Sequence, residues 1–240
     1  MKQAWVVCTK ELNSFFDSLM ASIVLIIFIG FSGFFTWFGF SSNVFFVDQA
    51  NLGVFFGVAY WSLFFFIPAL TMRQIAEEIR SGTIEMLLTK PIQRTQILLG
   101  KFMATMLLIT IALALTLPYY FTVSNIGKID HYAVWCGYLG LLLMSGAYTS
   151  IGLFCSSISK NQIVAFLISL FIGIFFHFLF DMIASGFAGT VGEILTYMSV
   201  TNHFDSISRG VIDSKDLIYF ASIIFVGLMA ADYTLAKRYN

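Results

Sequence analysis

The chain has 240 residues, of which 59% are hydrophobic and only 11% are charged, and its formal net charge is zero. Soluble domains carry about 25% charged residues, so this composition excludes an ordinary soluble protein and indicates that lipid is the main solvent. The zero net charge offers no basic field for nucleic acid. The three cysteines, Cys8, Cys136 and Cys155, are too scattered for a metal site or a disulfide framework.

Residues 1–18 do not have the pattern of a membrane span. Trp5, Cys8, Leu12 and Phe15 fall near helical spacing, and charged residues stand between them. This pattern predicts an amphipathic helix that lies in the membrane interface. The first long apolar run begins near Leu19, so we expect no cleavable signal peptide.

Six later segments are long and apolar enough to cross a bilayer, which takes about 20 residues at roughly 1.5 Å each. They are residues 19–40, 52–70, 97–121, 132–154, 163–183 and 217–235. Most are nearly free of charge, and a lone ion at mid-bilayer costs roughly 3 kcal/mol or more. The predicted fold is an all-α integral membrane protein with six transmembrane helices, forming a single domain over residues 1–240.

The distribution of Lys and Arg predicts the orientation. If the N-terminus is cytoplasmic, ten of these residues lie in inner segments and three, Lys128, Arg209 and Lys215, lie in outer ones. The positive-inside rule therefore places both termini in the cytoplasm, together with the loop between the second and third spans.

Polar residues near the outer side leave several interpretations open. His177 and Asp181, four residues apart in the fifth span, could line a polar pathway or form a local pair at the interface. The pattern Gly53-x-x-x-Gly57 allows close helix approach, either within the chain or in a dimer. No histidine has a second ligand at metal spacing, so we expect no metal.

The outer segment 184–215 contains two short apolar stripes. The first consists of Val191, Ile194, Leu195 and Met198, and the second of Phe204, Ile207 and Val211. Neither stripe is long enough to cross a bilayer. They predict two short helices, re-entrant or interfacial, in the outer leaflet before the sixth span.

The loop of residues 71–101 holds eight of the 26 charged residues. Its first part predicts a helix that continues from the second span, with one apolar face and with Arg73, Glu77, Glu78 and Arg80 on the rest. The apolar face consists of Met72, Ile75, Ala76 and Ile79. Gly82 can adopt the left-handed conformation that ends this helix.

A second short helix should follow in the same loop. Thr83 is suited to cap it, Glu85 lies in its first turn, and Pro91 should end it. Ile84, Leu87 and Leu88 form an apolar stripe with no evident partner in the chain, which favours a binding surface. The alternative is a solvated hairpin whose charges only mark the topology.

The run PALTMRQIAEEIRSGTIEMLLTKPIQRTQILLGKF resembles the permease subunits of type-two ABC exporters, in particular the bacterial gliding-motility ABC permease subfamily. The shared elements are a Pro and Met-Arg at the end of the second span, an acidic pair, and Gly-Thr-x-Glu-x-Leu-Leu-Thr-x-Pro. The segments HFDSISRGVIDSKDLIYF and KELNSFFDS extend the likeness to both ends of the chain.

The resemblance implies a permease subunit in the bacterial inner membrane that works with two copies of a cytoplasmic ATPase and a second copy of itself or a related permease. ATP and magnesium would be bound by the ATPase, and no cofactor by this chain. Residues 82–89 would form the coupling helix that contacts the ATPase, with Glu85 on it. The connecting helix would hold Arg73, Glu77, Glu78 and Arg80. ATP hydrolysis would then drive export or mechanical work.

The chain should not be an enzyme by itself. Its Gly100-Lys101 pair lacks both the first Gly and the following Ser or Thr of a phosphate-binding loop. Ion-coupled carriers usually place ionisable groups at mid-membrane, and the centres of these spans are almost empty of them. An intramembrane enzyme would need paired carboxylates or a Ser and His arrangement at depth, and the sequence shows neither. A membrane anchor that recruits a cytoplasmic partner without transporting a substrate remains the alternative, and the sequence does not identify a substrate.

Overall fold

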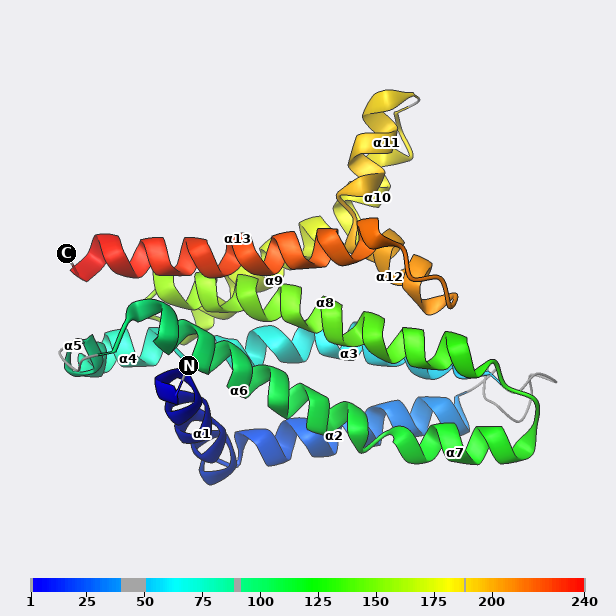
Figure 1. Ribbon diagram of the computed structural model, residues 1–240, viewed down its shortest axis with the longest axis horizontal. Coiled ribbons are helices and arrows are strands. Elements are labelled where there is room, and N and C mark those ends of the chain that lie inside the picture. Colours follow the sequence, from blue (N-terminus) through cyan, green and yellow to red (C-terminus); the bar gives the residue numbers. More distant parts are fainter. Residues whose placement is uncertain (1, 40–50, 89–91, 188, 240) are drawn as a thin grey trace.

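The computed structural model describes residues 2–39, 51–88, 92–187 and 189–239, with the side chains of Leu87 and Leu88 excepted. Every regular element in these ranges is a helix, as Figure 1 shows. In chain order they are α1 (Lys2–Asp17), α2 (Met20–Phe38), α3 (Gly53–Thr71), α4 (Ala76–Ser81), α5 (Thr83–Leu88), α6 (Arg94–Ala114), α7 (Leu117–Ile126), α8 (His131–Ile158), α9 (Gln162–Ile174), the π-helical turn η1 (Phe175–Leu179), α10 (Phe180–Ala184), α11 (Thr190–Tyr197), α12 (Val200–Ser208) and α13 (Ser214–Tyr239).

Six helical segments have the length and hydropathy to cross a membrane, which confirms the predicted fold class. They are Met20–Phe38, Gly53–Ser81, Arg94–Ile126, His131–Ile158, Gln162–Ala184 and Ser214–Tyr239. Because the number of crossings is even, both chain ends lie at the same end of the bundle (Figure 1).

Three of the six spans are not regular α-helices along their whole length. The second contains a turn over residues 72–75, between α3 and α4. The third breaks between α6 and α7, where Pro118 lies in the first turn of α7 and cannot donate a backbone hydrogen bond. The hydroxyl of Thr116 donates to the carbonyl of Leu113 at the break, at 2.7 Å. The fifth span contains the π-helical turn η1, which changes the angular spacing between the residues before it and those after it.

The centre of the bundle is α8, which packs against α3, α6, α9, α12 and α13. Small residues allow this crowding, because they let neighbouring backbones approach closely. A Cβ atom on Gly152 would lie 2.0 Å from the hydroxyl oxygen of Thr71 on α3. One on Gly137 would lie 2.6 Å from the ring of Phe56. Both the first and the last turns of α3 are therefore in close contact with α8.

The N-terminal helix α1 packs on α6 and α2 at the end of the bundle that carries the termini (Figure 1). It buries Ala4, Val7, Cys8 and Phe15 and leaves Trp5 exposed. This confirms an amphipathic helix over residues 2–17. Its location in the membrane interface stays a prediction.

The two short helices predicted before the sixth span are present as α11 and α12, and they differ in packing. In α12, Phe204 and Ile207 are buried against the bundle. In α11, Val191 and Ile194 are 55% and 57% exposed. Together, α10 and α11 project sideways from the bundle (Figure 1). Of the second predicted stripe, Phe204 and Ile207 therefore belong to the core of this chain, whereas Val211 is 60% exposed.

A buried polar contact holds α12 to the start of α13. The Nδ1 atom of His203 lies 2.6 Å from an oxygen of Asp216, and its Nε2 lies 2.9 Å from the carbonyl oxygen of Tyr197. The ring of Tyr219 stacks on the imidazole at 3.9 Å between centroids. Because a carbonyl oxygen can only accept a hydrogen bond, Nε2 carries a proton. The Nδ1 contact is then either an ion pair between imidazolium and carboxylate or a hydrogen bond from a protonated carboxyl group to the neutral imidazole.

The contact between Gly152 and Thr71 gives a first test. Gly152→Ala places a methyl group where the side chain of Thr71 already lies, so we expect overpacking to cost about 1–3 kcal/mol of stability. The measurement is the midpoint of thermal unfolding in detergent micelles. Gly30→Ala is the matched control, because a Cβ on Gly30 meets nothing within 4 Å. An equal response of both variants would contradict the close packing of α3 on α8.

Candidate functional site

The predicted helix–turn–helix of the charged loop is present as α4 and α5 at the end of the bundle that carries both termini, which we call the inner end (Figure 1). Gly82 joins them with φ +72°, the left-handed conformation expected at this position. The first helix is not a straight continuation of the second span, because a turn over residues 72–75 separates α3 from α4. The direction of α4 is therefore set by whatever holds this turn.

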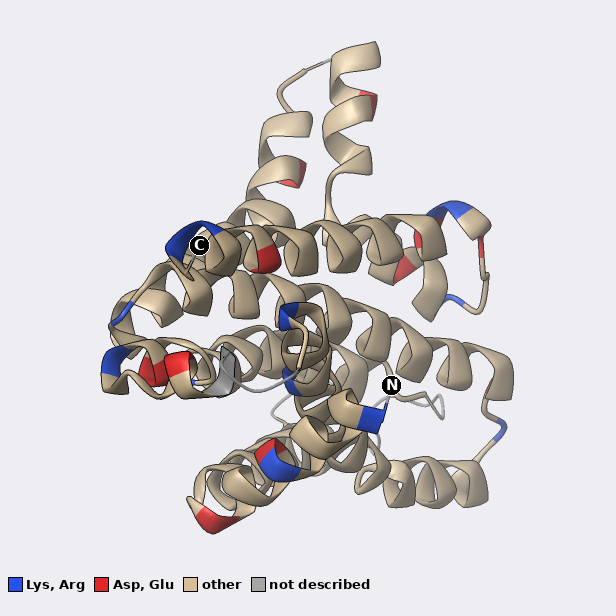
Figure 2. Ribbon diagram, turned by 60° about the vertical axis from the view of Figure 1, so that its left-hand side comes forward, with Lys and Arg blue, Asp and Glu red and all other residues tan. Residues whose placement is uncertain are grey.

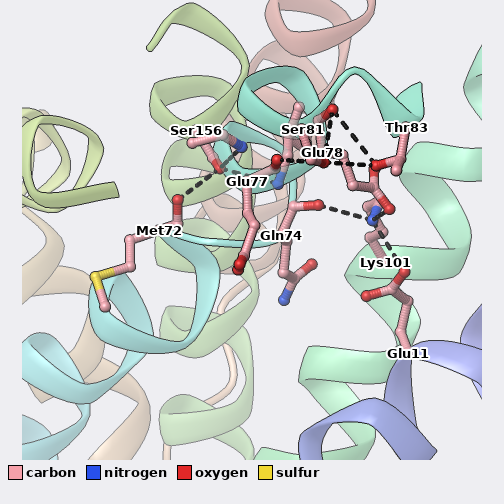
Figure 3. A network of polar contacts seen from close by, with 11 residues as sticks. Glu11, Met72, Gln74, Glu77, Glu78, Ser81, Thr83, Lys101 and Ser156 are labelled. Atoms are coloured by element: carbon pink, nitrogen blue, oxygen red, sulfur yellow. Dashed lines mark hydrogen bonds and ion pairs between the residues drawn. The ribbon is translucent and has the colours of Figure 1, made fainter. Parts of the chain in front are cut away.

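One hydroxyl of α8 holds the turn. The Ser156 oxygen accepts hydrogen bonds from the backbone amides of Ile75 and Ala76, at 3.1 and 2.9 Å. It also donates to the carbonyl of Met72 at 2.9 Å (Figure 3). Amides in the first turn of a helix have no partner within that helix, so this side chain from another helix acts as the cap of α4. All hydrogen-bonding capacity of the hydroxyl is used.

A buried lysine holds the same turn from the opposite side. The Nζ atom of Lys101, on α6, lies 2.9 Å from a carboxylate oxygen of Glu11 and 2.9 Å from one of Glu78. It also donates to the carbonyl of Gln74 at 2.8 Å (Figure 3). These three partners use all three donors of the ammonium group. The contacts tie α1, α4 and the turn before α4 to one atom of α6.

Burial makes this contact energetically important. The side chain of Lys101 is 1% exposed, and those of Glu11 and Glu78 are 12% and 15% exposed. Taking these charges out of water is costly, and their mutual attraction compensates the cost only while all partners are present. Removal of the ammonium group would leave two carboxylates facing each other in a poorly hydrated space.

The underside of the helix pair is apolar and packs on the bundle. Ile75, Ile79 and Ile84 belong to one buried cluster, together with Leu98, Leu153, Ala231 and Leu235. The prediction that Ile84 lacks a partner in the chain is therefore wrong. The pair lies over the inner ends of α6, α8 and α13, which provide that partner. The side chains of Leu87 and Leu88, and Pro91, lie outside the described residues.

The opposite face of the helix pair is exposed and charged. It includes Glu77, Arg80, Thr83 and Glu85. The predicted cap at Thr83 takes a different form, because its hydroxyl contacts the Ser81 hydroxyl at 2.9 Å and the Glu78 carbonyl at 3.5 Å. It thus ties the start of α5 to the end of α4. The remaining connecting-helix residue, Arg73, donates to the Ser18 hydroxyl at 2.8 Å.

The structure gives His177 and Asp181 different partners. The Nδ1 atom of His177 lies 2.8 Å from the hydroxyl of Tyr148. The carboxylate of Asp181 accepts hydrogen bonds from Ser199 and Asn202, both at 2.5 Å. The π-helical turn η1 ends between the two residues, so they do not have the spacing of an ordinary helical pair. A role for them in a polar pathway stays a prediction.

The anchoring residues Lys101, Glu11 and Ser156 were not predicted as functional. Lys101 carries the signal that could have identified it, because it is a charge inside the long apolar run of the third span. A charge in that position needs a partner from elsewhere. Ser156 has no comparable signal, since serines are common in packed membrane helices. In the part of the chain that the structure describes, no cluster of His, Cys, Asp and Glu could hold a metal ion.

The site thus consists of two short helices with a charged, exposed face. Their apolar underside and the polar contacts of Ser156 and Lys101 fix them to the bundle. A family model described as ABC-2 family transporter protein matches residues 5–231, nearly the whole chain. No curated protein matches this chain.

The buried ammonium group gives a second test. Lys101→Met keeps the length of the side chain but leaves Glu11 and Glu78 without their cation. We expect a loss of about 3 kcal/mol, at the lower end for a broken buried pair because both carboxylates keep some contact with water. The measurement is the unfolding midpoint in detergent micelles.

Two further variants control this experiment. Adding Glu78→Gln to Lys101→Met removes one of the stranded charges and should recover part of the loss. Lys215→Met breaks the exposed ion pair with Asp213 and should leave the midpoint unchanged. A Lys101→Met protein as stable as the unmodified chain would contradict the anchoring role.

Proposed function

The chain belongs to the ABC-2 family of transporter proteins and is a multi-pass membrane permease of that type, and we propose that α4 and α5 are its docking site for a separate ATPase. In this proposal ATP and magnesium bind to two ATPase copies, and a second permease, identical or related, completes the transporter. ATP hydrolysis would drive export or mechanical work, as the likeness to the gliding-motility subfamily suggests.

The observation that carries the proposal is the contrast between the two faces of the helix pair. Its apolar underside and its Lys101 and Ser156 contacts fix it to the bundle. Its opposite face leaves the side chains of Glu77, Arg80 and Glu85 exposed. A rigid element with charges of both signs suits a specific protein partner better than a flexible hairpin would.

The charge distribution supports a cytoplasmic position for this site. Basic residues of α1, α4 and the end of α13 gather at one end of the bundle with the two termini (Figure 2). The opposite end carries Lys128, Arg209 and Lys215. By the positive-inside rule, α4 and α5 face the cytoplasm of a bacterial cell, where an ATPase would meet them.

The proposal predicts that the chain forms a stable complex with the ABC ATPase encoded nearest to it and stimulates its activity. Glu85→Lys reverses a charge on the exposed face of α5. We expect the apparent affinity for the ATPase to fall roughly tenfold, which corresponds to about 1.4 kcal/mol. The measurement is ATP hydrolysis by the ATPase titrated with the permease in lipid nanodiscs.

Glu193→Lys is the matched control, because Glu193 is an exposed glutamate in the first turn of α11 on the opposite side of the membrane. It should leave the titration unchanged. Equal stimulation by Glu85→Lys and the unmodified chain would contradict the assigned role of α5. A complex that hydrolyses ATP but transports no substrate would instead support the alternative function, a membrane anchor that recruits a cytoplasmic partner.

A further inference from the structure

A cavity of about 1060 Å³ lies in the outer half of the bundle, far from α4 and α5. Its walls come from the first half of α3, the turn before α8, the segment around η1, and α12. Binding pockets for small molecules typically measure about 300–1,000 Å³, so this cavity is slightly larger than that range. It is large enough for an organic ligand.

Glycines keep one wall of the cavity open. Gly53 and Gly57 on α3 both line it. A Cβ atom on Gly57 would meet nothing within 4 Å, and one on Gly53 would meet only the side chain of Asn51. The Gly-x-x-x-Gly pattern is therefore not used for helix packing among the described residues. It provides space in the cavity that larger side chains would fill.

Aromatic side chains form much of the remaining wall. Tyr60 lies between two of them, with its ring 4.3 Å from that of His177 and 4.7 Å from that of Phe204. Trp61 and Phe178 also line the cavity and are about half exposed, at 50% and 54%. Aromatic faces of this kind attract cations as well as apolar groups.

The charged groups of the cavity are mostly acidic. Asp130, Asp181 and Asp205 line it, against the single ammonium group of Lys128. No ion pair between the described residues involves Asp181 or Asp205. The hydrogen-bond partners of Asp181 are neutral, so they orient its carboxylate without neutralising it.

One carboxyl group in the wall is in an unfavourable electrostatic setting, and one buried nitrogen lacks a hydrogen-bond partner. Burial raises the pKa of the Asp205 carboxyl, Arg209 opposes this shift, and the charge of Asp181 adds to it. The Nε2 atom of His177, which is buried, has no hydrogen-bond partner among the described residues. A cation near Asp205 and Asp181 would relieve the repulsion between the two carboxylates, and a ligand with a hydrogen-bonding group could satisfy the imidazole.

We propose that this cavity binds an amphipathic amine, with its ammonium group at Asp181 and Asp205 and its apolar body against Tyr60, Trp61 and Phe178. The ammonium group can come from a lipid headgroup or from a soluble amine. The site lies in one chain and is separate from the proposed ATPase contact. Its occupation can be tested without an ATPase, so failure of either proposal leaves the other intact.

The test uses the full chain in nanodiscs of phosphatidylglycerol, a lipid without an ammonium group. Benzyltrimethylammonium is the probe, and benzyl alcohol is its uncharged analogue. Calorimetric titration should show saturable binding of the probe and at least tenfold weaker binding of the alcohol. Equal binding of both compounds, or no saturable binding of the probe, would overturn the proposal.

Four variants locate the site. Asp205→Asn removes one carboxylate and Gly57→Leu fills the cavity, so each should weaken binding of the probe tenfold or more. The matched controls are Asp213→Asn, at an exposed aspartate on the same side of the membrane, and Gly30→Leu, at a glycine with open space on α2. Gly57→Val replaces Gly57→Leu if the larger variant does not fold. Probe binding that survives both site variants would overturn the proposal.

A final arm distinguishes the sources of the ammonium group. Phosphatidylethanolamine replaces part of the phosphatidylglycerol, and the titration is repeated. Competition with the probe would support a lipid headgroup as the ligand. Unchanged binding of the probe would support a soluble amine.

Discussion

The inner half of the structure depends on one buried ammonium group. Lys101 can remain charged on the apolar third span only because Glu11, Glu78 and the Gln74 carbonyl surround its Nζ atom. The partners come from segments 90 and 23 positions away in the chain, so satisfying one charge fixes the relative positions of α1, α4 and α6. The proposed ATPase contact is therefore supported by electrostatics as well as by apolar packing.

The two ends of the molecule have different chemistry, and α8 connects them. At the inner end its Ser156 hydroxyl holds the start of α4. At the outer end its first residues, including Ala133 and Val134, line the acidic cavity. Between these points, small residues bring α3 and α13 close to it. A ligand in the cavity and a partner on α4 and α5 would therefore contact the same packed helices.

Local signals in the sequence predicted the spans, the amphipathic α1 and the left-handed turn at Gly82, because hydropathy and glycine conformation act over a few neighbouring residues. The failures involve partners far away in the chain. Ile84 looked unpartnered because its neighbours come from α6, α8 and α13. His177 and Asp181 looked like a pair because no sequence pattern predicts the π-helical turn that ends between them. The role of Lys101 became visible only with Glu11 and Glu78 beside it.

The contact between Thr71 and Gly152 has a consequence for how the bundle can move. With no room for a side chain between α3 and α8 at this level, a shift of one helix along the other would drive larger residues into the gap. The two helices should therefore travel as one rigid body during any working cycle. Bending is easier where the regular α-helical hydrogen bonding changes, as it does at the break before Pro118 and at the π-helical turn η1 in the fifth span. We therefore expect movement within the spans to be concentrated at these two points.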